Sequence, residues 1–231
     1  VEKAAIELEK TINLDRVIEL ADQVKNLDCK RPEWMKICKK TKTRIGVAYD
    51  EAFYFYYEDN LKMLKNMGAE LVYFSPLHDK FLPEYLDGLL LGGGYPELFA
   101  EKLYKNESMR NNVREVICKG MPSLAECGGF MYLHDAITTK EGKRCEMTGI
   151  LHGECTYTEK LVRFGYITIK EKQPYFLSEK KGNEIRGHEF HYYDSTKNGE
   201  SCVATKPVTE RNWECVNVDD HSWWGFPHLY Y

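Results

Sequence analysis

One cysteine of this sequence lies in a setting typical of a catalytic nucleophile. Cys127 follows the short apolar segment Pro122–Ala125 and precedes Gly128 and Gly129. A sharp strand–nucleophile–helix turn requires small neighbours, and these glycines supply them. The sulfur would lie at the start of a helix, which favours the thiolate, and the N–H of Gly128 would point toward an oxygen that develops charge. We therefore predict that Cys127 is a nucleophile, and that the other cysteines are structural.

A second turn joins an apolar segment to three glycines. Leu89, Leu90 and Leu91 run directly into residues 92–94, all glycine. Such a loop can cradle a phosphate, but the Lys–Ser/Thr ending of a P-loop is missing. Because glycine permits close approach, its N–H groups could instead stabilise an oxyanion. A plain tight turn between a strand and a helix is the alternative.

A thiol nucleophile needs a base, usually a histidine distant in sequence. Three histidines are candidates: His188 and His191, which lie in one segment, and His228 near the end of the sequence. His188 and His191 could also form a metal pair. No third and fourth ligand follow at the spacing of a zinc site, so we expect no metal.

Alternating strands and helices must position these residues. Apolar runs predict strands at 45–49, 71–74, 86–91 and 122–125, and helices at 56–67, 97–119 and 128–135. This order is typical of an α/β fold with a parallel sheet and helices on both faces, which binds ligands at the carboxyl ends of its strands. Further strands are expected at 161–170 and 184–192.

The beginning of the sequence has a different pattern. Apolar residues at helical spacing follow Asn13, which is placed as an N-cap, and a segment rich in Lys and Arg extends from Lys30 to Lys42. We expect residues 1–42 to be a helical lead-in and linker from an absent domain. The main domain is then expected at 43–231.

Composition excludes several classes of protein. The 231 residues are 43% hydrophobic and bear a net charge of −4, so nucleic acid is not an expected partner. No stretch approaches the roughly 20 apolar residues of a membrane span. The eight cysteines are irregularly spaced in a large chain, which favours reduced thiols and a cytoplasmic location over a disulfide scaffold.

Five segments together resemble the C-terminal glutamine amidotransferase domain of cobyrinic acid a,c-diamide synthases. They occur in family order from about residue 44 onward. The resemblance implies a class I glutamine amidotransferase-like, flavodoxin-like fold with a mostly parallel sheet and helices on both faces. The segments are DEAFYFYYEDNL at 50–61, LDGLLLGGGYPE at 86–97, AECGGFMYL at 125–133, RFGYITI at 163–169 and RGHEFHYY at 186–193.

The resemblance also implies roles for individual residues. Cys127 matches the nucleophile, and His228, in the segment GFPHLYY, matches the catalytic histidine. Gly93, Gly94 and Gly128 match the positions that form the oxyanion and glutamine site.

Four further residues are expected on the substrate side of the site, and one of them is also an alternative base. They are Glu126, His188, Glu189 and His191, and His191 is the residue that could replace His228 as the base. The family's usual carboxylate two residues after the catalytic histidine is absent, because Tyr230 occupies that position.

The implied partners are glutamine, an N-terminal ATP-dependent synthetase domain and a tetrapyrrole substrate. ATP and Mg²⁺ are expected in that other domain; because this sequence contains no P-loop motif, we expect no cofactor in this chain. Cobyrinic acid is the first substrate candidate, and Ni-sirohydrochlorin is the alternative. Two other hypotheses for the function are a docking domain whose hydrolytic site has decayed and a different cysteine hydrolase with the same type of sheet.

Overall fold

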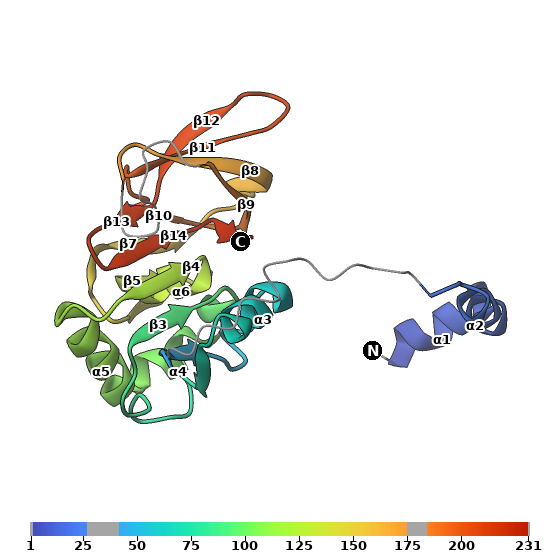
Figure 1. Ribbon diagram of the computed structural model, residues 1–231, viewed down its shortest axis with the longest axis horizontal. Helices are drawn as coiled ribbons and strands as arrows, with labels where there is room; N and C mark the ends of the chain where they lie inside the picture. The colour runs from blue at the N-terminus through green and yellow to red at the C-terminus, as the bar shows by residue number, and fades with distance from the viewer. Residues whose placement is uncertain (1, 27–41, 175–183, 231) are drawn as a thin grey trace. The chain divides into compact units, whose positions relative to one another are not determined.

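The structure is a computed structural model that describes residues 2–26, 42–174 and 184–230 (Figure 1). The chain divides into two compact units, Val1–Met35 and Lys36–Tyr231. Apart from its last residue, the predicted linker at 30–42 lies outside the described residues.

The first unit contains two helices, α1 (Glu2–Thr11) and α2 (Leu14–Asp22). The side chain of Asn13 accepts a hydrogen bond from the backbone N–H of Arg16 at 2.9 Å. This bond satisfies one of the free N–H groups at the start of α2. The predicted N-cap is therefore confirmed.

A six-stranded sheet forms the centre of the second unit. Its strands are β1 (Arg44–Ala48), β2 (Glu70–Phe74), β3 (Gly88–Leu91), β4 (Ser123–Glu126), β13 (Asn217–Val218) and β14 (Ser222–Gly225). They lie in the order β13-β14-β4-β3-β1-β2, and every adjacent pair is parallel except β13–β14. The predicted mostly parallel sheet is confirmed.

Helices pack on both faces of this sheet. They are α3 (Glu58–Asn66), η2 (Pro96–Phe99), α4 (Ala100–Lys105), α5 (Glu107–Cys118) and α6 (Gly128–Tyr132). Successive side chains of a strand point to opposite faces. Accordingly, Leu90 packs with Leu61 of α3, whereas Leu91 belongs to the core that contains Val113 of α5 and Phe130 of α6.

Two predicted helices differ from the structure. The helix expected at 128–135 ends at Tyr132, because the ring of His134 hydrogen-bonds the carbonyl of Phe130 and the chain enters a strand. The helix expected at 97–119 is divided into η2, α4 and α5. It breaks at Asn106, which leaves the helical conformation and whose side-chain amide donates to the carbonyl groups of two loop residues, Pro76 and Asp79.

The second unit contains two further sheets. A four-stranded sheet in the order β10-β7-β5-β6 comprises β5 (His134–Thr138), β6 (Arg144–Glu146), β7 (Leu151–Tyr157) and β10 (Tyr193–Ser195). An antiparallel five-stranded sheet in the order β12-β11-β8-β9-β15 comprises β8 (Arg163–Glu171), β9 (Glu184–His191), β11 (Cys202–Thr205), β12 (Asn212–Cys215) and β15 (His228–Leu229). The strands predicted at 161–170 and 184–192 correspond to β8 and β9.

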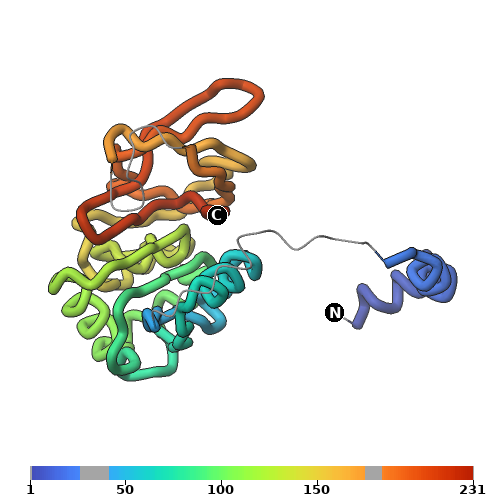
Figure 2. The backbone as a smooth tube through the Cα atoms, in the orientation of Figure 1, coloured from blue at the N-terminus to red at the C-terminus, as the bar shows by residue number. Residues whose placement is uncertain are grey.

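The C-terminal segment connects two of these sheets (Figure 2). Strand β14 pairs with β4 of the six-stranded sheet, where Gly225 lies opposite Glu126. After the two residues Phe226 and Pro227, β15 pairs with β9 of the five-stranded sheet, where His228 lies opposite His188. Phe226, between the two strands, packs against Phe130 with ring centroids 5.1 Å apart. This crossing places His228 beside the end of β4.

No helix among the described residues combines the length and the apolar character that crossing a membrane would require.

Because β3 lies in the centre of the sheet, removing a buried side chain from it should lower the stability of the fold. Leu91 has no exposed surface, whereas Leu98 in η2 is 74% exposed. We expect Leu91→Ala to lower the free energy of unfolding by about 2–5 kcal/mol, because the lost methyl groups leave a void in a packed core. The matched control Leu98→Ala should change it by less than about 0.5 kcal/mol. Urea unfolding monitored by circular dichroism measures both, and equal effects would contradict the placement of Leu91.

Candidate active site

Cys127 lies in a sharp turn between β4 and α6. Its backbone has φ 46° and ψ −104°, a conformation that residues with a side chain rarely adopt. Its N–H donates to the carbonyl of Gly225 at 2.9 Å, and its own carbonyl accepts from Met131 in α6. The turn thus has the geometry of a nucleophile elbow, in which the side chain projects from a strained backbone.

The two glycines after Cys127 are required by close packing. A Cβ atom at Gly129 would overlap the backbone carbonyl of Leu91 in β3, and one at Gly128 would lie 3.1 Å from the backbone nitrogen of Gly94. The N–H of Gly129 donates to the carbonyl of Gly92 at 2.9 Å. The triple-glycine turn and the Cys127 turn are therefore packed directly against each other.

His228 lies against the side chain of Cys127. Both side chains line the same cavity, and His228 is only 5% exposed. The ring of Phe55 packs edge-on against the imidazole, with centroids 4.6 Å apart. On its other side the imidazole lies against Gly93, where a Cβ atom would overlap Cε1 of the ring. Phe55 and Gly93 together fix the position of the imidazole.

The electrostatic setting of His228 favours its protonated form. Burial alone would lower the pKa of the imidazole, but negative charge on Cys127 and the hydrogen bond to that sulfur outweigh it. The carboxylate of Glu126 acts in the same direction, and the pKa of His228 is raised to about 10. A proton is therefore held on the ring next to the sulfur.

Two backbone N–H groups lie close to Cys127, those of Gly94 and Gly128. Gly128 is the first residue of α6, so its N–H has no acceptor within the helix. In the described part of the chain, the N–H of Gly94 also has no hydrogen-bond acceptor. The N–H of Gly93 differs, because it donates to the carbonyl of Phe55 at 3.3 Å. Gly93 thus contributes space for His228, while Gly94 and Gly128 retain available donors.

A small cavity lies in front of the sulfur. Its volume is about 210 Å³, below the range of pockets for drug-sized ligands and suited to a small metabolite. It is lined by Tyr54, Phe55, Gly94, Tyr95, Cys127, His188, Phe190 and His228.

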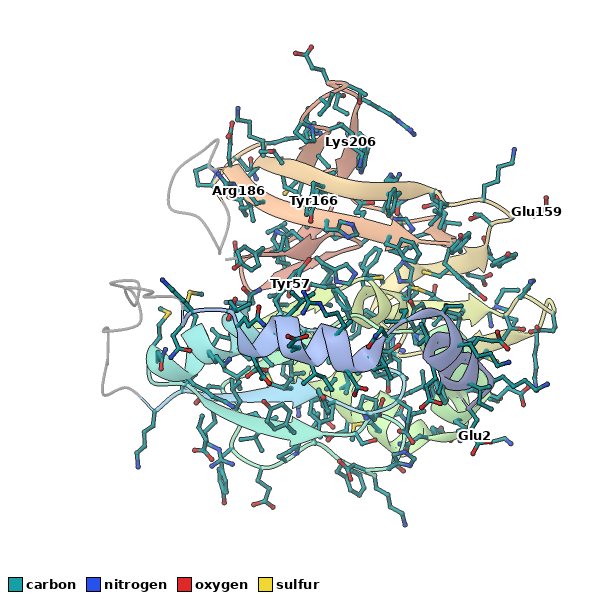
Figure 3. The ribbon with its side chains drawn as sticks, turned by 90° about the vertical axis from the view of Figure 1, so that its right-hand side faces the viewer. Glu2, Tyr57, Glu159, Tyr166, Arg186 and Lys206 are labelled. Carbon is teal, nitrogen blue, oxygen red and sulfur yellow. The ribbon has the colours of Figure 1, made fainter. Side chains whose placement is uncertain are left out.

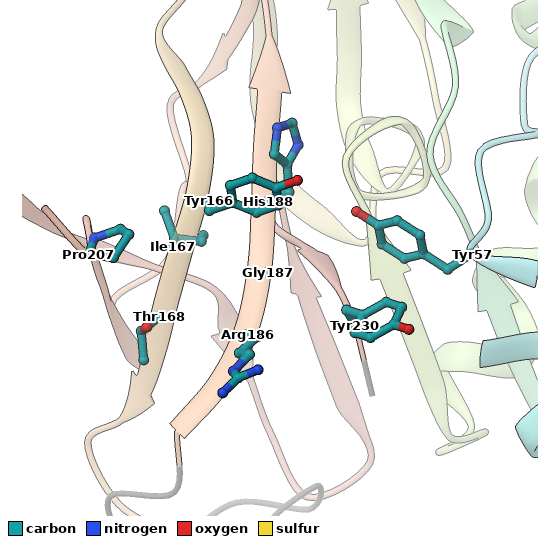
Figure 4. Close-up of a pocket in the computed structure, with 9 residues that line it drawn as sticks. All are labelled: Tyr57, Tyr166, Ile167, Thr168, Arg186, Gly187, His188, Pro207 and Tyr230. Carbon is teal, nitrogen blue, oxygen red and sulfur yellow. The ribbon is translucent and has the colours of Figure 1, made fainter. Parts of the chain in front are cut away.

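A larger pocket of about 510 Å³ adjoins this cavity, because His188 lines both. Figure 3 shows three of its other lining residues, Tyr57, Tyr166 and Arg186, on the side of the second unit that faces the viewer. In the close-up, the ring of Tyr57 points toward Tyr166 and His188 (Figure 4). The wall of this pocket is thus rich in aromatic side chains with one arginine among them.

The predicted substrate-side residues occupy three different settings. His188 lines the cavity, and burial together with the nearby His228 lowers its pKa. Glu126 lies behind His228, with one carboxylate oxygen 3.6 Å from Nδ1.

Glu189 and His191 form a buried network. Nε2 of His191 lies 3.0 Å from the carboxylate of Glu189, and Nδ1 lies 2.6 Å from the carbonyl of Tyr193. Trp213 donates to Glu189, and the His191 ring stacks on Phe226. Both ring nitrogens of His191 are thus occupied, whereas His228 contacts the sulfur.

Several residues of the cavity were not expected from the sequence. Phe55 and Tyr54 come from the loop between β1 and α3, Tyr95 follows the triple glycine, and Phe190 lies in β9. The aromatic run at 53–57 was a usable signal, because it follows the carboxyl end of a strand in an α/β sheet. Within the described ranges, no three His, Cys, Asp or Glu side chains come together as a metal site.

Comparison with protein families agrees with this geometry. A family model described as the CobB/CobQ-like glutamine amidotransferase domain matches residues 44–222. This chain belongs to that family. The match includes the Cys127 turn, and it confirms the family resemblance of the sequence motifs.

Curated relatives have the name cobyrinate a,c-diamide synthase. The protein of Caldanaerobacter subterraneus subsp. tengcongensis is 41% identical over 236 residues, which cover 95% of this chain and 52% of that protein. That of Picrophilus torridus is 40% identical and covers 100% of this chain and 50% of the relative. That of Thermoplasma volcanium is 45% identical over 78% of this chain and 39% of the relative. The chain spans about half the length of these proteins, or less.

Solved structures show the same fold at low sequence identity. PurLQS from Thermotoga maritima has a TM-score of 0.56 at 17% identity and covers 81% of this chain and 88% of that chain. A structure described as a glutamine amidotransferase has a TM-score of 0.53 at 16% identity, with 80% and 89% covered. The predicted fold class is confirmed.

The contact between Gly93 and His228 can be tested directly. An alanine methyl at position 93 would overlap the imidazole, so we expect Gly93→Ala to displace the ring from the sulfur. Because a neighbouring positive charge favours the thiolate, alkylation of Cys127 by iodoacetamide at pH 7 should slow about tenfold or more. Peptide mass spectrometry measures the rate.

The control is Gly142→Ala. A Cβ atom there meets nothing within 4 Å, although the φ of 85° makes the substitution strained. It should cost about 1 kcal/mol of stability without changing the alkylation of Cys127. An unchanged rate in a folded Gly93→Ala variant would contradict the described position of the ring.

Proposed function

We propose that this domain hydrolyses glutamine through a thioester on Cys127 and supplies the ammonia for ATP-dependent amidation of the a and c carboxylates of cobyrinic acid. The observation that most supports hydrolysis is that Cys127 and the buried His228 line one cavity of about 210 Å³. The cobyrinate part rests on the names of the relatives.

In the first half of the reaction, the thiolate of Cys127 attacks the side-chain amide carbon of glutamine. The carbonyl π electrons move to oxygen, and the N–H groups of Gly94 and Gly128 stabilise the negative charge. As the intermediate collapses, the C–N bond breaks. The leaving nitrogen takes the proton held by His228 and departs as ammonia, which leaves a thioester and a neutral imidazole.

In the second half, the neutral imidazole of His228 takes a proton from water. The hydroxide attacks the thioester carbon, and the same two N–H groups again stabilise the oxyanion. The C–S bond then breaks, which restores the thiolate beside a protonated His228 and releases the γ-carboxylic acid, whose proton passes to solvent as glutamate forms. The cycle returns the site to its starting protonation state.

The amidation step belongs to a partner in this proposal. ATP and Mg²⁺ would bind the other half of the synthase, since this sequence has no P-loop motif. The aromatic pocket shares His188 with the cavity, so it offers ammonia a route away from the sulfur in this proposal. A docking domain with a decayed site remains a second candidate, because Tyr230 stands where the usual carboxylate would be.

The identity of the nucleophile can be tested with a diazoketone analogue of glutamine. We expect it to alkylate Cys127 and to leave Cys118 unmodified, because Cys118 is exposed but lies outside the glutamine cavity. Burial raises the pKa of four further thiols and so reduces their reactivity: Cys145, Cys155, Cys202 and Cys215.

Mass spectrometry of all cysteine-containing peptides is the measurement, with Cys127→Ala as the control. An adduct on Cys118 in a protein whose Cys127 is unmodified would reject the assignment.

The acceptor can be identified by combining this chain with the N-terminal half of the Caldanaerobacter relative. With ATP, Mg²⁺ and cobyrinic acid present, ammonia release should rise above that of the chain alone, because docking shifts the site toward a competent arrangement. Glutamine labelled with ¹⁵N in its amide should transfer the label to the product. Ni-sirohydrochlorin is the alternative acceptor.

Equal ammonia release with and without the added half would rule out the coupling. No release under any condition would favour the decayed docking domain.

A further inference from the structure

We propose that Glu126, the residue immediately before the nucleophile, is the carboxylate that positions His228. This inference rests on the proposed glutaminase function. It assigns to Glu126 the role of a positioning residue, since it acts through His228 and does not line the cavity in front of the sulfur. Three features of the structure support it.

The first feature is the contact with the ring. Oε2 of Glu126 lies 3.6 Å from Nδ1 of His228, and both side chains are nine-tenths or more buried. The imidazole also lines one cavity with Cys127, whose charge acts on it. The ring therefore lies between a sulfur and a carboxylate, which is the order of groups in a catalytic triad.

The second feature is the unsatisfied nitrogen. Among the described residues, Nδ1 of His228 is buried without a hydrogen-bond partner. A buried N–H without an acceptor costs about 1–3 kcal/mol. The nearest carboxylate is that of Glu126, and hydrogen bonds of catalytic groups are often long before substrate binds. A movement of less than about 1 Å would bring the two atoms to hydrogen-bond distance.

The third feature is the second oxygen of the same carboxylate. Oε1 of Glu126 accepts the backbone N–H of Leu229 at 3.3 Å. One side chain thus contacts both the ring of His228 and the backbone of the next residue in β15. This double contact fixes the strand that bears the base relative to the strand that bears the nucleophile.

The residue in the usual triad position has a different role. Tyr230 is half exposed, and its ring packs edge-on against Tyr57 with centroids 5.3 Å apart. It lines the adjoining aromatic pocket. Tyr230 therefore does not take the place of the triad carboxylate. The carboxylate nearest Nδ1 of His228 is instead that of Glu126, at the end of the strand that precedes Cys127.

The test compares Glu126→Gln with wild type in the 231-residue chain. Glutamine keeps an oxygen for the N–H of Leu229 but removes the charge next to Nδ1. Without this charge the pKa of His228 should fall, measured by NMR of ¹³C-labelled histidine, and the kcat of glutamine hydrolysis should fall about 10- to 100-fold. This loss is smaller than the roughly 10⁴-fold of a directly bonded triad carboxylate, because the contact is longer.

The titratable groups around the pair must be considered in the NMR measurement. His228 also faces Cys127 and His188, and Glu126 also faces Tyr57. Repeating the titration in Cys127→Ala removes the sulfur, so the remaining difference between Glu and Gln at position 126 reports the carboxylate alone.

Glu189→Gln is the matched control. Glu189 is also buried and lies beside a different histidine, His191. Its substitution should leave the pKa of His228 unchanged. A purely structural carboxylate at position 126 would give the same result as this control.

Unchanged pKa and kcat in Glu126→Gln would overturn the inference. If that variant does not fold, Glu126→Asp decides the question: a shortened side chain should lower the pKa of His228 partly, and an unchanged value would overturn it. The proposed function fails on a different result, which is glutamine hydrolysis that persists in Cys127→Ala.

Discussion

The strained backbone of Cys127 is the constraint on which the site depends. A positive φ at a residue with a side chain costs of order 1–3 kcal/mol and persists only where the surroundings enforce it. Here the enforcement is close packing, since α6 approaches β3 until Gly129 touches the carbonyl of Leu91. The Cys–Gly–Gly sequence is thus required by contact between a helix and the central sheet, and the projection of the sulfur is its consequence.

The imidazole of His228 is positioned by a junction between two sheets. Gly225 ends a strand of the six-stranded sheet opposite Glu126, and His228 begins a strand of the five-stranded sheet opposite His188. Only two residues separate these strands, and the ring of Phe226 is fixed between Phe130 and His191. The buried network of Glu189 and His191, which was expected to face substrate, lies behind this junction and stabilises it.

The local sequence pattern was sufficient to predict part of this arrangement. The parallel sheet, the turn at Cys127 and the N-cap at Asn13 each depend on neighbouring residues, so the sequence predicts them. The choice of His228 over His188 and His191 depended on family resemblance, because strand pairing between distant segments has no local signature. The contact of Glu126 with Nδ1 was not predicted for the same reason: it depends on where β15 lies relative to β4.

The crossing of the C-terminal segment also has a consequence during synthesis. Cys127 is synthesised 101 residues before His228. Strand β14, whose Gly225 carbonyl accepts the N–H of Cys127, is synthesised just before His228. At about 5–20 residues per second, the nascent chain contains the thiol for several seconds without its base. Under the proposed function, the thiol acquires its base only when these strands are made, so a nascent chain that lacks them would not hydrolyse glutamine.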